Sequence, residues 1–407
     1  MPRIRSYHFH LPQFSFDHSR DLKLLYGIRI FRSLIGKLAM FFLPLFLFQL
    51  GPQVNWFTGW GLSEFQQGVV MIAGYYVLAR SMSLLTAIPI GKLVIKTSHQ
   101  LAFLFSHLLH SLVFIGLIYA PTQPAILLLV AIIDGIQINF IWNSYHSLLS
   151  FNALKKTMGQ DLGLLRVLLN LIYMISPALG GLLVVLAGYQ SLFMVSLFFE
   201  LIGVICALLM NSKKLKDQIS WQEFWSWLQE KRFVSLGFSF VGRYFHDATL
   251  VVWPLYVFLL LGQVDRVGYL YSLSLFLAMM VSLFMGWHLD HHKSRKPFLL
   301  SGGILSILWI IRSFIFNIWS IAIVDMIDKL TGNFHWLFYD RALFNRGKGS
   351  QAYSYFVYRE MIVSATAVVF WTVFALLFIV FPLGWRGLFG LAAIGVALSL
   401  LVREQSH

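Results

Sequence analysis

Long, unbroken apolar segments recur along this chain of 407 residues and constrain its fold more than any other feature. Each is long enough to cross a membrane core about 30 Å thick, which takes roughly 20 helical residues. Only 12% of the residues are charged, against about 25% in soluble domains. Strands of a membrane β-barrel are about 10 residues long and alternate, so these runs exclude a barrel. The sequence therefore predicts an all-α integral membrane protein with about twelve transmembrane helices, near residues 25–50, 66–90, 100–120, 124–150, 162–187, 190–211, 234–261, 267–289, 297–317, 319–343, 354–380 and 384–402.

The distribution of Lys and Arg over the loops predicts how these helices are oriented. Basic residues gather at both termini and in every second loop, whereas the opposite side has only Arg266 and Arg386. Because cytoplasmic loops carry an excess of Lys and Arg, we expect both termini and the central linker in the cytoplasm, in a plasma or inner cell membrane. This bias accounts for the net charge of +14, which is therefore no argument for a nucleic acid partner. The one cysteine, Cys206, lies within a span, so neither a disulfide nor a cysteine metal site is expected.

The two halves of the chain repeat one another. Asn, Phe, Trp and Tyr recur at identical spacing in residues 139–146 and 333–340. Further matches in the same order relate Arg32 to Arg243 ahead of a shared proline motif, His110-Ser111 to Arg312-Ser313, Asp134 to Asp325, and residues 188–193 to 384–389. Because both halves have the same number and orientation of spans, they are expected to be parallel repeats, a mark of two-lobed transporters. The predicted domains are a six-helix lobe at 1–211, a linker at 212–232 and a second six-helix lobe at 233–407.

The linker contains one amphipathic segment. Ser220 and Glu223 fit a capping box at the start of a helix. The Trp, Phe, Trp and Leu residues at 221, 224, 225 and 228 then form one apolar stripe. We expect this helix to lie in the cytoplasmic membrane interface. It is either a tether that coordinates two moving lobes or a connector that rests on lipid.

One loop carries the motif of a known family. After the eighth span, Gly286 is followed by Asp290 and by a basic cluster that includes Arg295 and Lys296. This loop resembles the cytoplasmic-loop signature of the major facilitator superfamily, Gly-x-x-x-Asp followed by basic residues, and the architecture is similar to that family over the whole chain. The counterpart loop in the first half has Ile95 where the family has Asp. Residues 177–181, Pro-Ala-Leu-Gly-Gly, also look like a family pattern that is often seen in exporters.

The resemblance implies a secondary active transporter in which two lobes rock about a central cavity lined by spans 1, 4, 7 and 10. The sequence concentrates polar residues on those spans, and charges at bilayer depth mark functional sites. The residues expected to line the cavity are Arg32, Asp134, Gln137, Asn143, Arg243, Asp247, Asp325, Asp328, Asn333 and Trp336. Gating is expected from Gly286, Asp290, Arg295, Lys296, Arg166 and Arg359, and the alternative for the loop motif is a positive-inside anchor. For Arg243 with Asp247 and for Asp325 with Lys329, ion pairs that only stabilise a helix are the alternative.

The charges within the spans indicate the chemistry of the solute. Basic residues outnumber acidic ones there, which favours a small anionic or polar solute. Asp134 and Asp325 are the candidates for proton binding, because buried carboxylates can load and release protons near neutral pH. Efflux of drugs or metabolites, a non-pumping sensor and a lipid scramblase are the alternatives. No paired nucleophile and base and no phosphate-binding loop occur, so we expect no enzyme, no ATP-driven pump, no metal and no cofactor, and a monomer in the lipid bilayer. The sequence assigns no role to Arg80, Glu200 and Arg312.

Overall fold

A computed structural model describes residues 20–152, 158–212, 215, 217–289, 295–315, 317–347, 351–381 and 383–402, and this part of the chain is helical without any strand. The helices before the linker are α1 (Arg20–Leu38), α2 (Leu43–Leu50), α3 (Glu64–Lys96), α4 (His99–Tyr119), α5 (Ile126–Asn152) and α6 (Met158–Leu208). Those that follow are α7 (Trp221–Gln229), α8 (Lys231–Leu261), α9 (Val264–Leu289), α10 (Lys296–Ile311), α11 (Ile318–Arg346), α12 (Ala352–Ile379) and α13 (Gly384–Ser399). Short 3₁₀ helices are η1 (Gly51–Gln53), η2 (Asn55–Phe57) and η3 (Arg312–Phe314).

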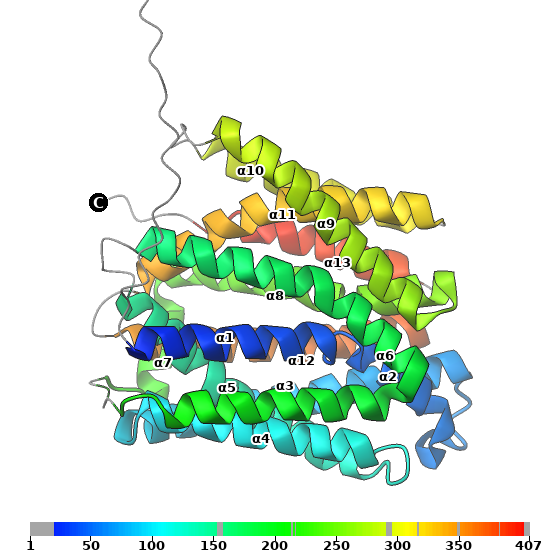
Figure 1. Ribbon diagram of the computed structural model, residues 1–407, viewed down its shortest axis with the longest axis horizontal. Helices are drawn as coiled ribbons and strands as arrows, with labels where there is room; N and C mark the ends of the chain where they lie inside the picture. Colours follow the sequence, from blue (N-terminus) through cyan, green and yellow to red (C-terminus); the bar gives the residue numbers. More distant parts are fainter. Residues whose placement is uncertain are drawn as a thin grey trace, which may run out of the picture.

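These helices supply the predicted passages across the membrane, and most run nearly parallel (Figure 1). The first passage combines α1, α2 and η1, and α6 contains the fifth and sixth, which meet at Gly188. Eight described segments are long and apolar enough to span a membrane by length and composition alone. α11 is not among them because it carries Asp325, Asp328 and Lys329 within its length. The all-α prediction is confirmed.

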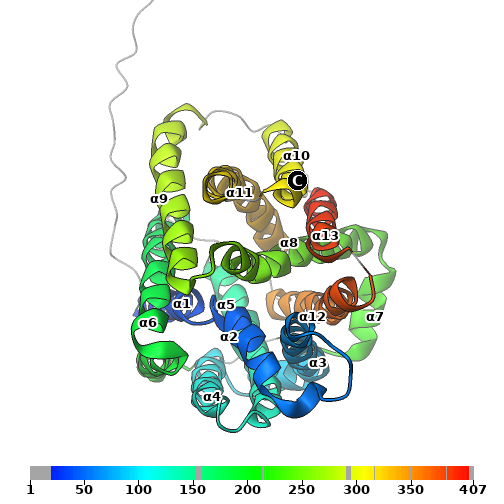
Figure 2. The same cartoon turned by 90° about the vertical axis from the view of Figure 1, so that its right-hand side faces the viewer.

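The helices pack as two groups. In the first, α1 packs on α6, α3 packs on α5, and α4 packs on α5 and α6; in the second, α8 and α10 pack on α13, and α9 packs on α11. The groups meet mainly where α6 lies along α9 and where α3 lies along α12, on two sides of the bundle viewed along the helices (Figure 2). We refer to α1–α6 as the N-terminal half and to α8–α13 as the C-terminal half. The end of the bundle where α1 begins is the inner end, and the opposite end is the outer end.

The backbone repeats along with the sequence. The sixth passage of each half begins at a glycine in the left-handed region, Gly188 with φ 77° and Gly384 with φ 46°. Side chains with a Cβ disfavour this conformation, so glycine is required where the chain turns back into the bundle. The two glycines are equivalent positions of the sequence repeat, which supports the pairing of the two halves.

Helix α7 packs on the inner end of the C-terminal half. The Ser220 side chain accepts a hydrogen bond from the backbone N–H of Glu223 at 3.1 Å, which is the first half of the predicted capping box. The second half does not form, because the Ser220 N–H donates to the Tyr358 hydroxyl, which in turn donates to the Glu223 carboxylate. Phe224 is buried against Tyr358, and Trp227, which lies outside the predicted stripe, also packs on Tyr358. Trp221 and Trp225 of the stripe are exposed. One side of the apolar stripe therefore packs on α12, and its other side is exposed.

Candidate functional site

A buried polar network in the N-terminal half contains three of the residues expected to line the cavity. Arg32 donates to the side-chain oxygen of Gln137 at 2.7 Å and to Glu200 at 3.2 Å. Gln137 donates to Asp134 at 2.9 Å, and the Tyr75 hydroxyl donates to the same carboxylate at 3.0 Å. These side chains come from α1, α3, α5 and α6, so the network ties four helices together. It brings Arg32, Asp134 and Gln137 together as expected, but buried among the helices of one half.

A second buried network lies in the C-terminal half around Arg312. Its guanidinium is fully buried, donates to Asp325 at 3.0 Å and lies 3.6 Å from Asp328. The rings of Trp253 and Trp309 cover it, with centroids 4.5 and 4.0 Å away. A cation held in this way by carboxylates and aromatic faces is stabilised inside a bilayer. Arg312, to which the sequence assigned no role, therefore joins η3 to α11.

The ion pair between Asp325 and Lys329 does not form in this network. Asp325 bonds to Arg312, and the indole N–H of Trp253 also donates to it at 3.1 Å. The Lys329 ammonium instead lies 3.8 Å from Asp328 and donates to the Tyr271 hydroxyl at 3.1 Å. The i, i+4 spacing permits a pair along the helix, but the guanidinium that η3 places beside Asp325 competes successfully for it.

The repeated Trp-x-x-Tyr sequences form two similar arginine–aromatic clusters, one in each half. The distances from the guanidinium carbon to the ring centroids are 5.0 and 5.4 Å for Arg29 over Trp142 and Tyr145, and 3.9 and 5.7 Å for Arg243 over Trp336 and Tyr339. The contacts thus pair Arg243 with Arg29, whereas the sequence match paired it with Arg32. Arg29 and Arg32 are nearly one turn apart along α1, so they lie at different depths in the bundle and contact different side chains.

Arg243 and Asp247 form the predicted i, i+4 ion pair at 2.7 Å within α8. Their side chains are 23% and 45% exposed, although they lie near the middle of a membrane-crossing helix. The carboxylate of Asp340 on α11 acts electrostatically on both Arg29 and Arg243. A charged pair that is exposed at this depth fits a cavity between the halves better than a lipid-facing surface.

Further charged contacts cross between the halves at residues outside the predicted cavity set. Arg80 of α3 lies 3.4 Å from Glu360 of α12 and 5.5 Å from the ring of Tyr244 in α8. Lys37 of α1 lies over Tyr173 of α6 and Tyr271 of α9, at 5.3 and 5.5 Å from the centroids. The available signal was the charge itself, because a lysine or arginine at bilayer depth marks a functional site.

The remaining expected cavity and gate residues are more scattered. Asn143 is buried, and its amide nitrogen has no hydrogen-bond partner among the described residues. Asn333 is half-buried on α11, and Arg359 lies 3.9 Å from Glu360. Arg295 donates to the carbonyl of Leu400 at 2.7 Å, so it ties α10 to the end of α13. Lys296 begins α10, Gly286 lies in α9, and Arg166 lies in α6 with its side chain undescribed. Asp290 lies outside the described residues. The gating roles of these four residues stay predictions.

The two halves touch on either side of this charged interface. Toward the inner end, the His146 ring of α5 stacks on Phe356 of α12 with centroids 5.3 Å apart. Toward the outer end, Phe41 packs on Tyr271 with centroids 4.8 Å apart. The Pro-Ala-Leu-Gly-Gly segment at 177–181 also lies there, and it lets α6 approach the backbone of α9 closely. The interface charges thus lie between two sets of contacts that join the halves, one toward each end of the bundle.

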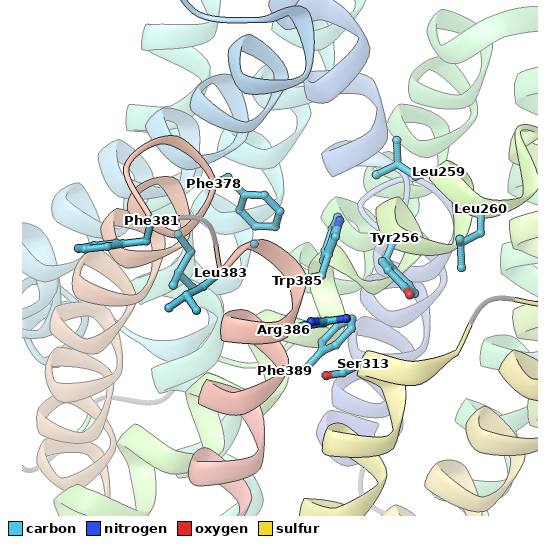
Figure 3. Close-up of a pocket in the computed structure, with 12 residues that line it drawn as sticks. Tyr256, Leu259, Leu260, Ser313, Phe378, Phe381, Leu383, Trp385, Arg386 and Phe389 are labelled. Carbon is cyan, nitrogen blue, oxygen red and sulfur yellow. The ribbon is translucent and has the colours of Figure 1, made fainter.

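A separate cavity of about 610 Å³ lies at the outer end of the C-terminal half (Figure 3). Most of its lining is apolar or aromatic, with Tyr256, Trp385 and Phe389 near its centre. Arg386, one of the two basic residues predicted on that side, is its charged member. None of the interface charges lines this cavity, so its walls fit an apolar group better than a polar solute.

Comparison with known proteins identifies the family. The model of the Major Facilitator Superfamily matches residues 25–326. No curated protein matches the chain. The structure of a variant of the nucleoside transporter NupG is 12% identical with a TM-score of 0.63, and the structure of NupG itself is 12% identical with a TM-score of 0.59. Each match covers 94% of this chain and 98% of the NupG chain. A POT family transporter in complex with 5-aminolevulinic acid is 15% identical with a TM-score of 0.64, over 96% of this chain and 97% of that one. The chain is therefore a multi-pass membrane transporter of the major facilitator superfamily, as its architecture and loop motif predicted.

Proposed function

We propose that the protein is a secondary active transporter that carries a small anionic or polar organic solute across the cell membrane by alternating access. The observation that carries this proposal is the set of basic side chains that lie against aromatic rings at or near the interface of the halves, Arg29, Lys37, Arg80, Arg243, Lys329 and Arg359. Guanidinium and ammonium groups bind carboxylates and phosphates, and aromatic rings stack on planar groups. The basic groups favour an organic anion over a lipophilic cation, and the rings can stack on a planar part of that anion.

Lys37 is the cation best placed to meet such a solute. No carboxylate of the described residues lies within 4 Å of its ammonium, which faces Tyr173 and Tyr271 instead. Those two tyrosines belong to different halves, on α6 and α9. A solute bound at Lys37 would thus contact both halves at once. Such shared contacts are what allow binding to shift the equilibrium between conformations.

A thermal-shift screen tests the proposal on the purified protein. The ligands are organic anions, amino acids including 5-aminolevulinic acid, nucleosides, sugars and cationic drugs. A ligand at 100 times its dissociation constant stabilises a protein by about 2.7 kcal/mol, which is readily measured. We expect a stabilising anion whose effect is lost in Lys37→Gln and retained in Arg266→Gln, a control at an exposed outer residue. Stabilisation confined to cationic drugs and lost in Asp247→Asn would overturn the proposed charge of the solute.

We further propose that protons drive this transport, with Asp134 or Asp325 as the carrier. Both carboxylates are buried and each is held by donors of its own half. The test uses proteoliposomes and the anion found in the screen. Neutralising the working carboxylate to Asn abolishes uphill uptake under a pH gradient and leaves exchange intact. Full uphill uptake in both Asn variants would exclude these two carriers, and binding without any accumulation would indicate a sensor.

A further inference from the structure

Glu200 lies at the centre of an unusual cluster in the N-terminal half. The carboxylate is fully buried on α6 and has three basic neighbours. His107 contacts one of its oxygens at 2.5 Å, and Arg32 donates to the other at 3.2 Å. His110 contacts that second oxygen through Nδ1. The imidazoles are within the bilayer and are 0% and 1% exposed.

Nδ1 of His110 is placed so that it has a partner in either protonation state. It lies beside both the guanidinium of Arg32 and the carboxylate of Glu200. With a proton, Nδ1 donates to Glu200; without one, it accepts from Arg32. A buried imidazole that loses its only partner on deprotonation would incur a desolvation penalty. Nδ1 of His110 therefore keeps a partner in both states, while Nε2 of His107 and of His110 has no hydrogen-bond partner among the described residues.

The charges around the cluster favour the uptake of one proton. The helices packed here contribute Arg32 from α1, the neutral Tyr75 from α3, the two histidines from α4, Asp134 and the neutral Gln137 from α5, and Glu200 from α6. Arg29, one turn from Arg32, lies over Trp142 and interacts electrostatically with both Arg32 and Asp340. With neutral imidazoles, one guanidinium faces two carboxylates, which leaves one negative charge buried. One bound proton cancels that charge, and an unbalanced charge is costly to bury.

In the C-terminal half, the position that matches His110 is occupied by an arginine. Arg312, which the sequence repeat matches to His110, lies between Asp325 and Asp328, and Lys329 completes the set. Two cationic side chains there face two carboxylates. A permanent charge in one half is thus replaced by an imidazole in the other. Of these two positions, only that of His110 holds a side chain whose ordinary pKa lies near neutral pH.

Gly203 makes room for this cluster. A Cβ on Gly203 would lie 2.4 Å from Cε1 of His107, which is closer than real Cβ atoms approach. Because Gly203 and Glu200 are three residues apart on α6, the glycine allows the His107 ring to lie against the helix and reach the carboxylate. A larger residue at 203 would push the ring away from Glu200.

We propose that His107, His110 and Glu200 form a site that binds one exchangeable proton inside the N-terminal half, and that this proton is the one used in coupled transport. The second part rests on the proposed proton coupling, and it is an alternative to Asp134 or Asp325 as the carrier. The first part concerns the protein alone.

Infrared difference spectroscopy of the protein in lipid membranes, between pH 5.5 and pH 8, tests the site with protons as the ligand. We expect an imidazole and carboxylate signal from buried groups that is lost in Glu200→Gln and in His110→Gln, and reduced in Gly203→Ala. His99→Gln is the matched control, because His99 is a buried histidine of the same helix near Ser147 and should leave the signal unchanged. If Glu200→Gln does not fold, His107→Gln serves as the second variant. An unchanged signal in the folded variants of the cluster would overturn the site.

The same variants test the proton site and its role in coupled transport independently. Loss of the infrared signal together with loss of pH-driven uptake of the anion found in the screen supports both parts. Loss of the signal with uphill uptake intact would leave the site standing and refute its role in coupling. Absence of any pH-driven uptake in the unmodified protein would refute the proposed proton coupling without affecting the site.

Discussion

Replacing Gly268 with alanine should open the outer end of the transporter. Gly268 lies near the start of α9, where a Cβ would be 2.2 Å from the carbonyl oxygen of Pro177 and 3.3 Å from Cα of Ala178. Both atoms are backbone, so no side chain can move aside, and the helices have to separate by about 1 Å to reach ordinary contact. Overpacking of this kind costs about 1–3 kcal/mol. The conformation in which α6 and α9 separate avoids that cost, so its population relative to the closed one should rise about 5- to 150-fold.

Distances between spin labels measure this shift. Labels at Gln123 and Gln263, both exposed at the outer end of different halves, are introduced after Cys206→Ser removes the native thiol. We expect a longer distance to gain population in Gly268→Ala. Gly303→Ala is the control, because Gly303 is a helical glycine with no atom within 4 Å of its Cβ position, and its distances should not change. An unchanged distribution in a well-folded Gly268→Ala protein would refute the argument that this contact closes the outer end.

Three further changes have defined outcomes. Arg312→Gln leaves buried carboxylates unpaired and should destabilise the protein by about 3–5 kcal/mol in thermal unfolding, and adding Asp325→Asn should recover part of this loss. Tyr358→Phe removes the hydroxyl that bonds to Ser220 and Glu223, so hydrogen exchange in α7 should rise, whereas Tyr355→Phe, whose hydroxyl has no partner among the described residues, should not change it. Asp290→Asn should shift label distances at the inner end toward the inward-facing state if this loop latches the gate, and unchanged distances would exclude that role.

Local patterns in the sequence predicted the features that depend on one helix at a time. Helix α7 begins at the predicted N-cap Ser220, and Arg243 bonds to Asp247 one turn along α8. The paired glycines Gly188 and Gly384 turn the chain at equivalent points. All of these depend on spacing along the chain, which hydropathy, capping rules and helical periodicity describe well.

Those patterns did not predict which side chains of different helices contact one another. Periodicity showed that Arg32 is on the polar side of its span, but not that Glu200, far along the chain on α6, would bind it. A turn of 100° per residue decides whether a side chain faces its own half or the other one, and the sequence does not state where the neighbouring helix lies. Lys37 was missed for the same reason, since its partners Tyr173 and Tyr271 belong to different halves.

The two kinds of charged cluster suit different tasks in a transporter that rocks. A contact between halves, such as Arg80 with Glu360, changes when the halves move, so it reports and controls the conformation. In the proposed mechanism, a network inside one half keeps its side-chain contacts while that half moves as a rigid body, and its charge is set by protons. Energy coupling requires that the buried network and the contacts between the halves influence each other. On α1, the residues that belong to these two clusters are one helical turn apart. Arg32 belongs to the buried network, while Arg29 lies over Trp142 in the aromatic cluster near Asp340 of the opposite half. A change of one charge beside Arg32 is therefore felt by Arg29 across low-dielectric surroundings, where charges interact more strongly than in water.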